Sequence, residues 1–216
     1  MRFLTAIVLT SSLALSACAT LKNPVAKDAT LDAPDLIETL PAELGTFDYE
    51  GYRYFQDDSN GYTFRYTNEN KHRMADVYVY PVAAENSDLE HDDLVMGSTR
   101  ATIQAIGDAV SQGIYTNFNV VGAATQARGI RTVARVEATY LRQNLASYTL
   151  VYQTEYDGTL LKIRVSMPDN ESNRSNTEWD EFANTMFNTI VEELDDSRTV
   201  KAKAKVKADV KADSKV

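Results

Sequence analysis

Two stretches in the first half of the chain have the hydrophobic pattern of strands. Aromatic residues occupy every second position in 62–66 and alternate with polar ones, and the apolar run 76–80 ends at Pro81. This period is typical of a strand with one buried face, and proline cannot extend the hydrogen bonding of a central strand. Residues 52–55 precede the turn-forming segment 57–61, so the pattern predicts a hairpin of 52–55 with 62–66.

Further along the chain, the pattern predicts a second hairpin and one more strand. Asp157 and Gly158 form the sequence of a favoured two-residue type I′ turn. Pairing about this turn places Tyr152 opposite Ile163, and the apolar positions of both strands then share one face. The run 134–140 alternates in the same way. We expect one face of this sheet to be buried and the other to be mostly solvated.

Two amphipathic helices are predicted from apolar residues spaced three and four apart. The first covers 96–110 and ends before Gly113. The second begins at the capping-box sequence 175–178 and carries an apolar stripe over 179–194. Between the first helix and the next strand, residues 122–129 are small, which predicts a loop.

The order of strands, helix, strands and helix indicates one α+β domain from about 50 to 196. We expect an antiparallel sheet of about five to seven strands, one mid-chain helix and one C-terminal helix. The arrangement resembles the PsbP/Mog1 sandwich in the strand 61–66, the helix around 103–110, and the hairpin 148–167 with the helix from Glu178. That family includes non-catalytic accessory and binding proteins, so the resemblance implies recognition more than catalysis.

The N-terminal sequence resembles that of a bacterial lipoprotein precursor. One early cation, Arg2, precedes the apolar run 3–15, which is shorter than the roughly 20 residues that a membrane-spanning helix needs. The segment 15–18 (Leu-Ser-Ala-Cys) matches the lipobox of that family. The resemblance implies cleavage before Cys18 and acylation of its sulfur and its new amino group, with the lipid bilayer as partner. The alternative is an ordinary secretory signal that is cut nearby.

On this resemblance the chain has four parts. Residues 1–17 are a signal peptide, 18–49 are the lipidated Cys with a flexible tether, 50–196 are the folded domain, and 197–216 are a basic tail. Lys alternates with Ala or Val in the tail, which predicts disorder. An Asp after the lipidated Cys retains such proteins in the inner membrane. Ala19 stands there instead, which implies an outer-membrane location facing the periplasm.

Composition narrows the classes of partner. The chain carries 22 Lys+Arg against 31 Asp+Glu, a formal net charge of −9, and the basic tail leaves the body strongly acidic. Nucleic-acid-binding proteins present a basic face, so we expect no nucleic-acid partner. Cys18 is the single cysteine, which excludes a disulfide within the chain. No cofactor is expected.

No stretch of the sequence has a convincing catalytic constellation. His91 with Glu90, Asp92 and Asp93 has the side-chain types of a divalent-cation site, but adjacent residues cannot all point inward. We interpret this segment as a solvated helix start, where acidic residues are favourable, and expect no metal. The chain has two His and no Gly-x-Ser-x-Gly sequence, which argues against a Ser-His-Asp triad.

Four cations are candidates for partner binding, because the pattern allows them to share the wetter face of the sheet. They are Arg131, Arg135, Lys162 and Arg164. Against an otherwise acidic body, they predict a docking surface for an anionic partner. The alternative is a solvated face with cross-strand pairs, such as Arg135 with Glu137 or Glu155.

These observations lead to three hypotheses. The first is a non-enzymatic outer-membrane lipoprotein whose α+β domain binds a periplasmic protein or another envelope component. The second is an envelope hydrolase that uses a pair of carboxylates, which requires a deep cleft that gathers them. The third is a structural lipoprotein that attaches to the cell wall through the basic tail 197–216.

Overall fold

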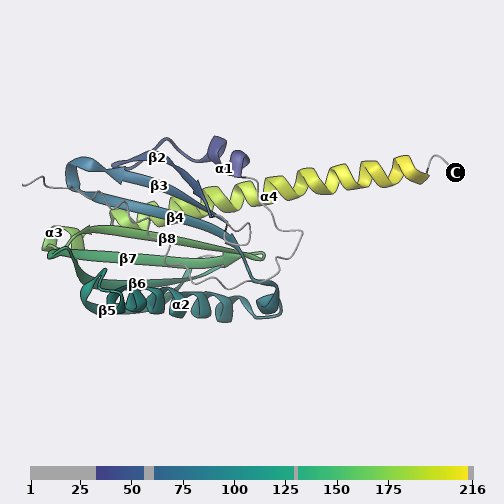
Figure 1. Cartoon of the computed structure of the whole chain (residues 1–216). Coiled ribbons are helices and arrows are strands. Elements are labelled where there is room, and N and C mark those ends of the chain that lie inside the picture. Colours follow the sequence, from purple (N-terminus) through teal and green to yellow (C-terminus); the bar gives the residue numbers. More distant parts are fainter. Residues whose placement is uncertain (1–32, 56–60, 129–130, 214–216) are drawn as a thin grey trace, which may run out of the picture.

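The fold is built on one antiparallel sheet with helices on both faces (Figure 1). The computed structural model describes residues 33–55, 61–128 and 131–213 of the 216-residue chain. The strands are β1 (Glu43–Leu44), β2 (Phe47–Tyr54), β3 (Tyr62–Asn68), β4 (Arg73–Pro81), β5 (Thr116–Arg128), β6 (Arg131–Arg142), β7 (Leu145–Tyr156) and β8 (Thr159–Pro168). The helices are α1 (Ala33–Thr39), η2 (Glu69–Lys71), η3 (Ala84–Asn86), α2 (His91–Ser111), α3 (Glu171–Arg174) and α4 (Glu178–Asp213).

The sheet consists of two meanders that meet in its middle. The strand order is β1-β2-β3-β4-β8-β7-β6-β5, so β4 pairs with β8 and every other pair is consecutive in sequence. The expected α+β class and antiparallel pairing are therefore confirmed. The expected count of five to seven strands is wrong, because the sheet has eight, and the described residues contain four α-helices rather than two.

The larger part of the core lies between the sheet and α4. The stripe predicted for this helix is buried, and Trp179, Phe182 and Ile190 are at most 3% exposed. The ring of Phe47 on β2 packs edge-on against Trp179, with their centroids 5.5 Å apart. These contacts hold the first half of α4 against the sheet, while its second half extends beyond the domain (Figure 1).

The other face of the sheet is covered by α2 at β5, β6 and β7. Ile106 and Ala109 of α2 pack with Tyr115 and Tyr140 in a second, smaller core. The helix ends where predicted, because Gly113 follows it with φ +73°, a conformation that glycine adopts without strain. The face predicted to be mostly solvated is therefore buried over β7. Gln153, for example, is 1% exposed and donates to Ser98 and Thr102 on α2.

The hairpin of β7 and β8 has the predicted register. Tyr156 pairs with Thr159 and Tyr152 with Ile163. The turn residues Asp157 and Gly158 have φ of 48° and 78°. Positive φ at both positions matches the twist of the flanking strands, as the predicted type I′ turn requires.

Two segments expected to lie outside regular structure belong to the fold. The end of the expected tether, from 33 to 49, forms α1, β1 and the start of β2, and Leu36 is completely buried. The expected loop 122–129 forms most of β5 up to Arg128. The prediction of a tether is wrong for 33–49 because Leu36 packs with the α4 core. The prediction of a loop at 122–129 is wrong because pairing with β6 satisfies the backbone hydrogen bonds of these small residues.

The last helix differs from expectation at both ends. It begins at Glu178 as predicted, but Ser175 donates to the carbonyl of Glu171, and Asn176 Oδ1 instead accepts from the Glu178 amide. At the other end the helix continues to Asp213, so the segment 197–213 is helical rather than disordered. Ala and Lys are strong helix formers, which favours this continuation.

The lipobox and the signal peptide lie outside the described residues, as does most of the predicted turn 57–61. Within the part of the chain that is described, no helix combines the length and the apolar character that crossing a membrane requires.

Candidate functional site

The four cations predicted to form one docking surface lie on opposite faces of the sheet. The strand register pairs Arg135 with Tyr152, which faces α4. The same register pairs Lys162 with Gln153 and Arg164 with Val151, on the face that α2 covers in part. Because side chains alternate between faces along a strand, Arg131 lies on the same face as Arg135. The prediction of a single four-cation surface is therefore wrong.

Arg131 and Arg135 are engaged in contacts that attach β6 to α4. Arg131 Nη2 donates to Asn188 Oδ1 at 2.7 Å. Arg135 forms the predicted ion pair with Glu137 and lies 3.6 Å from Asp180 at the start of α4. Burial alone lowers the pKa of Arg135, but Tyr152 and Glu137 raise it above its ordinary value. These two arginines are charged and already partnered, so they serve packing.

The other two cations belong to a surface that we call the open face. It is the α2-side surface of β3, β4 and β8, which continues the sheet beyond the strands that α2 covers. It is formed by Thr63, Arg65, Asp76, Tyr78, Tyr80, Lys162 and Arg164. All of these residues except Asp76 are half-buried, although Thr63 Oγ1 and Arg164 Nε are themselves buried.

Lys162 is supported by tyrosine rings. Its Nζ lies 4.2 Å from the ring centroid of Tyr78 and 5.7 Å from that of Tyr80. Tyr78 is in turn stacked on Phe55, with an interplanar angle of 10°, and the hydroxyl of Tyr80 is 2.9 Å from Ser98 Oγ on α2. A cation over an aromatic face is attracted by the ring quadrupole, so Lys162 is held in place while its ammonium stays available.

Arg164 lies between two further tyrosines, at the boundary of the open face with α2. Its Nη2 donates to the hydroxyls of Tyr140 and Tyr115 at 3.2 and 3.4 Å. Its Nε is buried and has no hydrogen-bond partner. Burial alone lowers the pKa of Arg164, but Tyr140 and Tyr115 raise it above its ordinary value, so the group stays charged.

The charges of the open face are unequally neutralised. Asp76 forms a bidentate ion pair with Arg65, at 2.7 and 3.2 Å, and Glu50 on β2 also acts on Arg65. Among the described residues, neither Lys162 nor Arg164 has a carboxylate within ion-pair distance. In the part of the chain that the structure describes, these two cations are thus held by rings and hydroxyls rather than by carboxylates.

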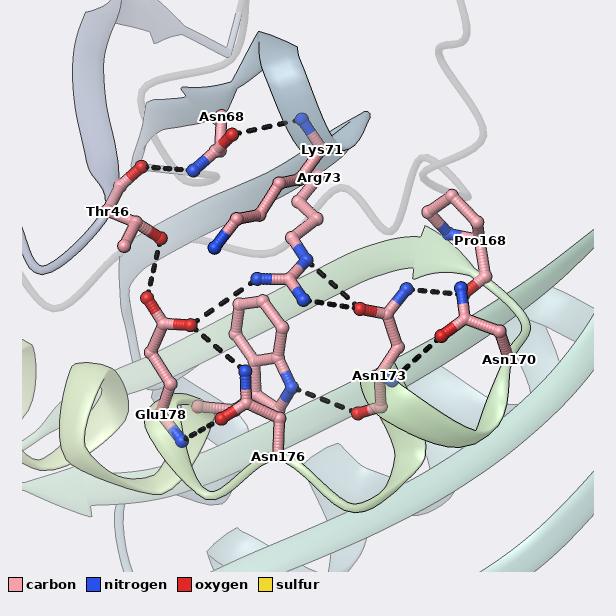
Figure 2. Close-up of polar contacts among 10 residues, drawn as sticks. Thr46, Asn68, Lys71, Arg73, Pro168, Asn170, Asn173, Asn176 and Glu178 are labelled. Carbon is pink, nitrogen blue, oxygen red and sulfur yellow. Dashed lines mark hydrogen bonds and ion pairs between the residues drawn. The ribbon is translucent and has the colours of Figure 1, made fainter.

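A buried arginine at one end of the sheet shows the opposite arrangement (Figure 2). Arg73 donates from Nε and Nη2 to Asn173 Oδ1, and its Nη1 lies 3.3 Å from Glu178 Oε2. The guanidinium also lies 4.7 Å from the ring centroid of Trp179. This cluster joins β4 to α3 and to the start of α4.

The partners of Arg73 are themselves fixed by hydrogen bonds (Figure 2). Asn173 donates to the carbonyl of Pro168, and Glu178 accepts from Thr46 and Asn176. Burial alone raises the pKa of Glu178, but the bonds from Thr46 and Asn176 and the charge of Arg73 bring it below its usual value. Every polar group is engaged, so the cluster is a structural corner.

His91 is held by hydrogen bonds at both ring nitrogens. Its Nδ1 lies 2.8 Å from Glu155 Oε2, and its Nε2 accepts from the Thr132 amide at 3.1 Å. Glu155 also accepts from the Gly158 amide. Both ring nitrogens are therefore engaged in joining α2 to β6 and β7, and no group of three metal-ligating side chains occurs within the described ranges.

A surface hollow with a volume of about 550 Å³ lies at α3. It is lined by Asp169, Asn170, Glu171, Arg174 and Ser175. Asp169 is paired with Arg174 at 2.5 and 2.7 Å, and this bond lowers the pKa of the Asp169 carboxyl. A carboxyl with a lowered pKa is a poor general acid, so Asp169 does not suit the acid role of the hydrolase hypothesis.

The sequence reasoning missed the tyrosines that support the open-face cations. Tyr78 and Tyr80 occupy alternate positions of a strand that was predicted, so their common face could have been read from the pattern. Tyr115 and Tyr140 come from separate elements and could not have been placed together without the fold.

Comparison with known proteins gives partial structural similarity. No family profile and no curated protein sequence matches the chain. The chain is similar to cyanobacterial PsbP (CyanoP) from Synechocystis sp. PCC 6803, with 14% identity and a TM-score of 0.47, over 72% of this chain and 88% of that one. It is also similar to the Ran-binding protein Mog1p of Saccharomyces cerevisiae, with 13% identity and a TM-score of 0.35, over 65% and 80%.

A third similar structure is PA94 from Pseudomonas aeruginosa, described as a protein of unknown function and putative regulator. It has 9% identity and a TM-score of 0.35, over 50% of this chain and 68% of that one. PsbP and Mog1, which the order of elements suggested, are thus both among the similar structures. At these scores the similarity is partial.

Proposed function

We propose that this protein is a lipid-anchored binding protein of the bacterial periplasm. Cys18, acylated in the outer membrane, holds the domain at the bilayer, and the open face binds an acidic segment of a periplasmic partner protein. The role is non-catalytic. The single observation that carries the binding part is that Lys162 and Arg164 are supported by tyrosines and have no carboxylate partner among the described residues.

The chemistry of the open face suits an acidic polypeptide. Lys162 and Arg164 lie on the same strand two residues apart, so their side chains are near neighbours on one face. An acidic side chain that approaches them forms charge-assisted hydrogen bonds. Tyr78 and Tyr80 add aromatic contact area, and tyrosine is enriched at protein interfaces for this reason.

The binding proposal is tested by crosslinking in intact cells followed by mass spectrometry. The full chain is compared with K162E and with R142E, which makes the same charge change at an exposed arginine at the β6–β7 end of the sheet. We expect a specific partner whose recovery falls at least about tenfold in K162E, a loss of about 1.4 kcal/mol or more, and is unchanged in R142E. Equal recovery from both variants contradicts the proposal.

The anchoring proposal has its own test. Labelling with palmitate should mark the full chain and fail to mark C18S, and C18S should leave the membrane fraction. An unlabelled parent chain, or a C18S variant that still sediments with membranes, contradicts the anchor and leaves the open-face test unaffected.

A further inference from the structure

The two edges of the sheet differ in how well they are protected from further strand pairing. One edge is β1, which has two residues, and beyond it the exposed part of β2 carries a bulge between Tyr49 and Gly51. Charged residues Asp48, Glu50 and Arg53 also lie on β2. Short edge strands, bulges and charges are the usual means by which proteins prevent edge-to-edge association.

The opposite edge, β5, is long and largely uncharged. It has 13 residues, and its first twelve, 116–127, include no charged residue and no proline. Its register with β6 shifts between Thr116 and Asn119 and again between Val120 and Gly122, and from Gly122 onward the pairing is regular. From Asn119 to Ala127 the side chains are exposed, except for a half-buried Gly122.

The exposed part of β5 also presents apolar surface. Val120 is 38% exposed and Val121 is 49% exposed, and they are two of the six large hydrophobic residues that are exposed among those described. Because β5 is the last strand of the sheet and pairs on one side with β6, the backbone groups on its other side face no further strand of the described residues. Such an edge can hydrogen-bond to another extended chain.

The distribution of charge on the protein indicates which extended chain can pair with β5. The protein has a formal net charge of −9, so two copies repel each other over most of their surfaces. The segment 119–127 is uncharged, so two copies can meet there without placing like charges opposite one another. Two-fold symmetry is the commonest symmetry of soluble oligomers. A two-fold axis perpendicular to two adjacent β5 strands makes these strands antiparallel.

We propose that β5 is a self-association site, at which two copies of the chain pair through residues 119–127 and join their sheets edge to edge. This inference is independent of the open-face proposal, because Lys162 and Arg164 lie on β8, three strands away from β5.

The first test uses single cysteines in the full chain in intact cells. In a symmetric antiparallel pair, the residue at the two-fold axis lies opposite its own copy, so V121C, A123C and T125C sample successive positions on one side of the strand. Mild oxidation should give a disulfide-linked dimer that peaks at one of these positions. A101C, at an exposed position of α2, and the parent chain with Cys18 alone give the background.

The second test measures the association itself. The full chain in detergent is examined by density-matched sedimentation, together with A123K/T125K and the control A101K/A105K, which adds the same charge at exposed sites on α2. We expect a dimer for the parent and the control, and a self-association constant weakened at least about tenfold in A123K/T125K. Thermal unfolding followed by circular dichroism verifies that each variant is folded.

Two results overturn the inference. One is a parent chain that stays monomeric at all concentrations and gives no disulfide above background at any β5 position. The other is crosslinking of the β5 cysteines to a different protein in place of a second copy, which assigns the edge to another partner.

Discussion

Arg73 and Arg164 lie in the same sheet, but their side chains have different kinds of partner. Arg73 is 7% exposed and directs its hydrogens to Asn173 and Glu178, whose remaining groups are bonded in turn (Figure 2). Arg164 is half-buried, donates to two tyrosine hydroxyls, and has a buried Nε without a partner. Arg73 is thus hydrogen-bonded to a carboxylate and an amide within the fold, whereas Arg164 has no carboxylate partner among the described residues.

This difference shows how a structural charge can be told from an available one. A buried charge that is fully hydrogen-bonded is costly to break and offers nothing to a ligand. A cation that rests on aromatic rings keeps its Coulombic interaction for an incoming anion. The same criterion separates Lys162 from Arg135, which is paired with Glu137 on the opposite face.

The largest effect is expected from R73M. Removing one member of a buried, hydrogen-bonded ion pair leaves Glu178 and Asn173 without their partner, and such changes cost about 3–5 kcal/mol. Urea unfolding of the variant and the parent measures this loss. A difference below about 1 kcal/mol would show that the corner contributes little and would remove the contrast with Arg164.

A smaller effect is expected on the acid side. The pKa of Glu178 in the folded protein lies below its ordinary value of 4.5, so the unfolded chain takes up the proton first as the pH falls. The contribution of Glu178 is therefore complete above about pH 4.5 and is lost as the pH falls through the folded pKa.

The variant E178Q should show a shallower loss of unfolding free energy between about pH 5 and 3, because its amide does not titrate. Urea unfolding at several pH values measures this slope. Parallel slopes in the parent and in E178Q would contradict the linkage. Asp169, whose pKa is lowered by Arg174, should give a second and separate contribution, so D169N should also show a shallower slope while it leaves Glu178 and its partners unchanged.

R164M should change the free energy of unfolding by less than about 1 kcal/mol. Methionine preserves apolar contact with Tyr115 and Tyr140, and its introduction removes a buried Nε that has no partner. Replacing an imperfectly satisfied buried charge by an apolar side chain is often neutral. Made alongside R73M, this is the same substitution at two sites, and equal losses would refute the distinction drawn between them.

The smallest effect on stability is expected from K162A. A half-buried lysine without an ion pair among the described residues should contribute within about 0.5 kcal/mol, even though its loss weakens partner capture. Thermal unfolding and crosslinking yield, measured on the same preparation, separate the two roles. A clear loss of stability without a loss of capture would assign Lys162 to packing.

The parts of the fold that were predictable are those with local signals. Asp157 and Gly158 specified the register of β7 with β8, and spacing of apolar residues located α2 and the buried half of α4. Gly113 marked the end of α2 through its positive φ. In each case the information lies within a few residues of the element it determines.

What could not be predicted depends on contacts between distant segments. β5 contains Gly122 and several alanines, which have low strand propensity, and its conformation comes from pairing with β6. The faces of Arg135 and Lys162 depend on the register between β6 and β7. No turn dipeptide as favoured as Asp157-Gly158 specifies that register. Leu36 appeared to belong to a tether because its partners on α4 come much later in the sequence.

The 36-residue helix α4 also has a practical consequence for measurement. Its buried stripe ends near Leu194, and at 1.5 Å per residue the helix continues roughly 28 Å past Leu194, beyond the domain (Figure 1). A fluorophore attached near Asp213 would therefore be carried on a rod fixed to the domain. The polarisation of its fluorescence would follow the tumbling of the whole molecule. The rate of partner binding at the open face, or of pairing at β5, could then be measured with a label that contacts neither surface.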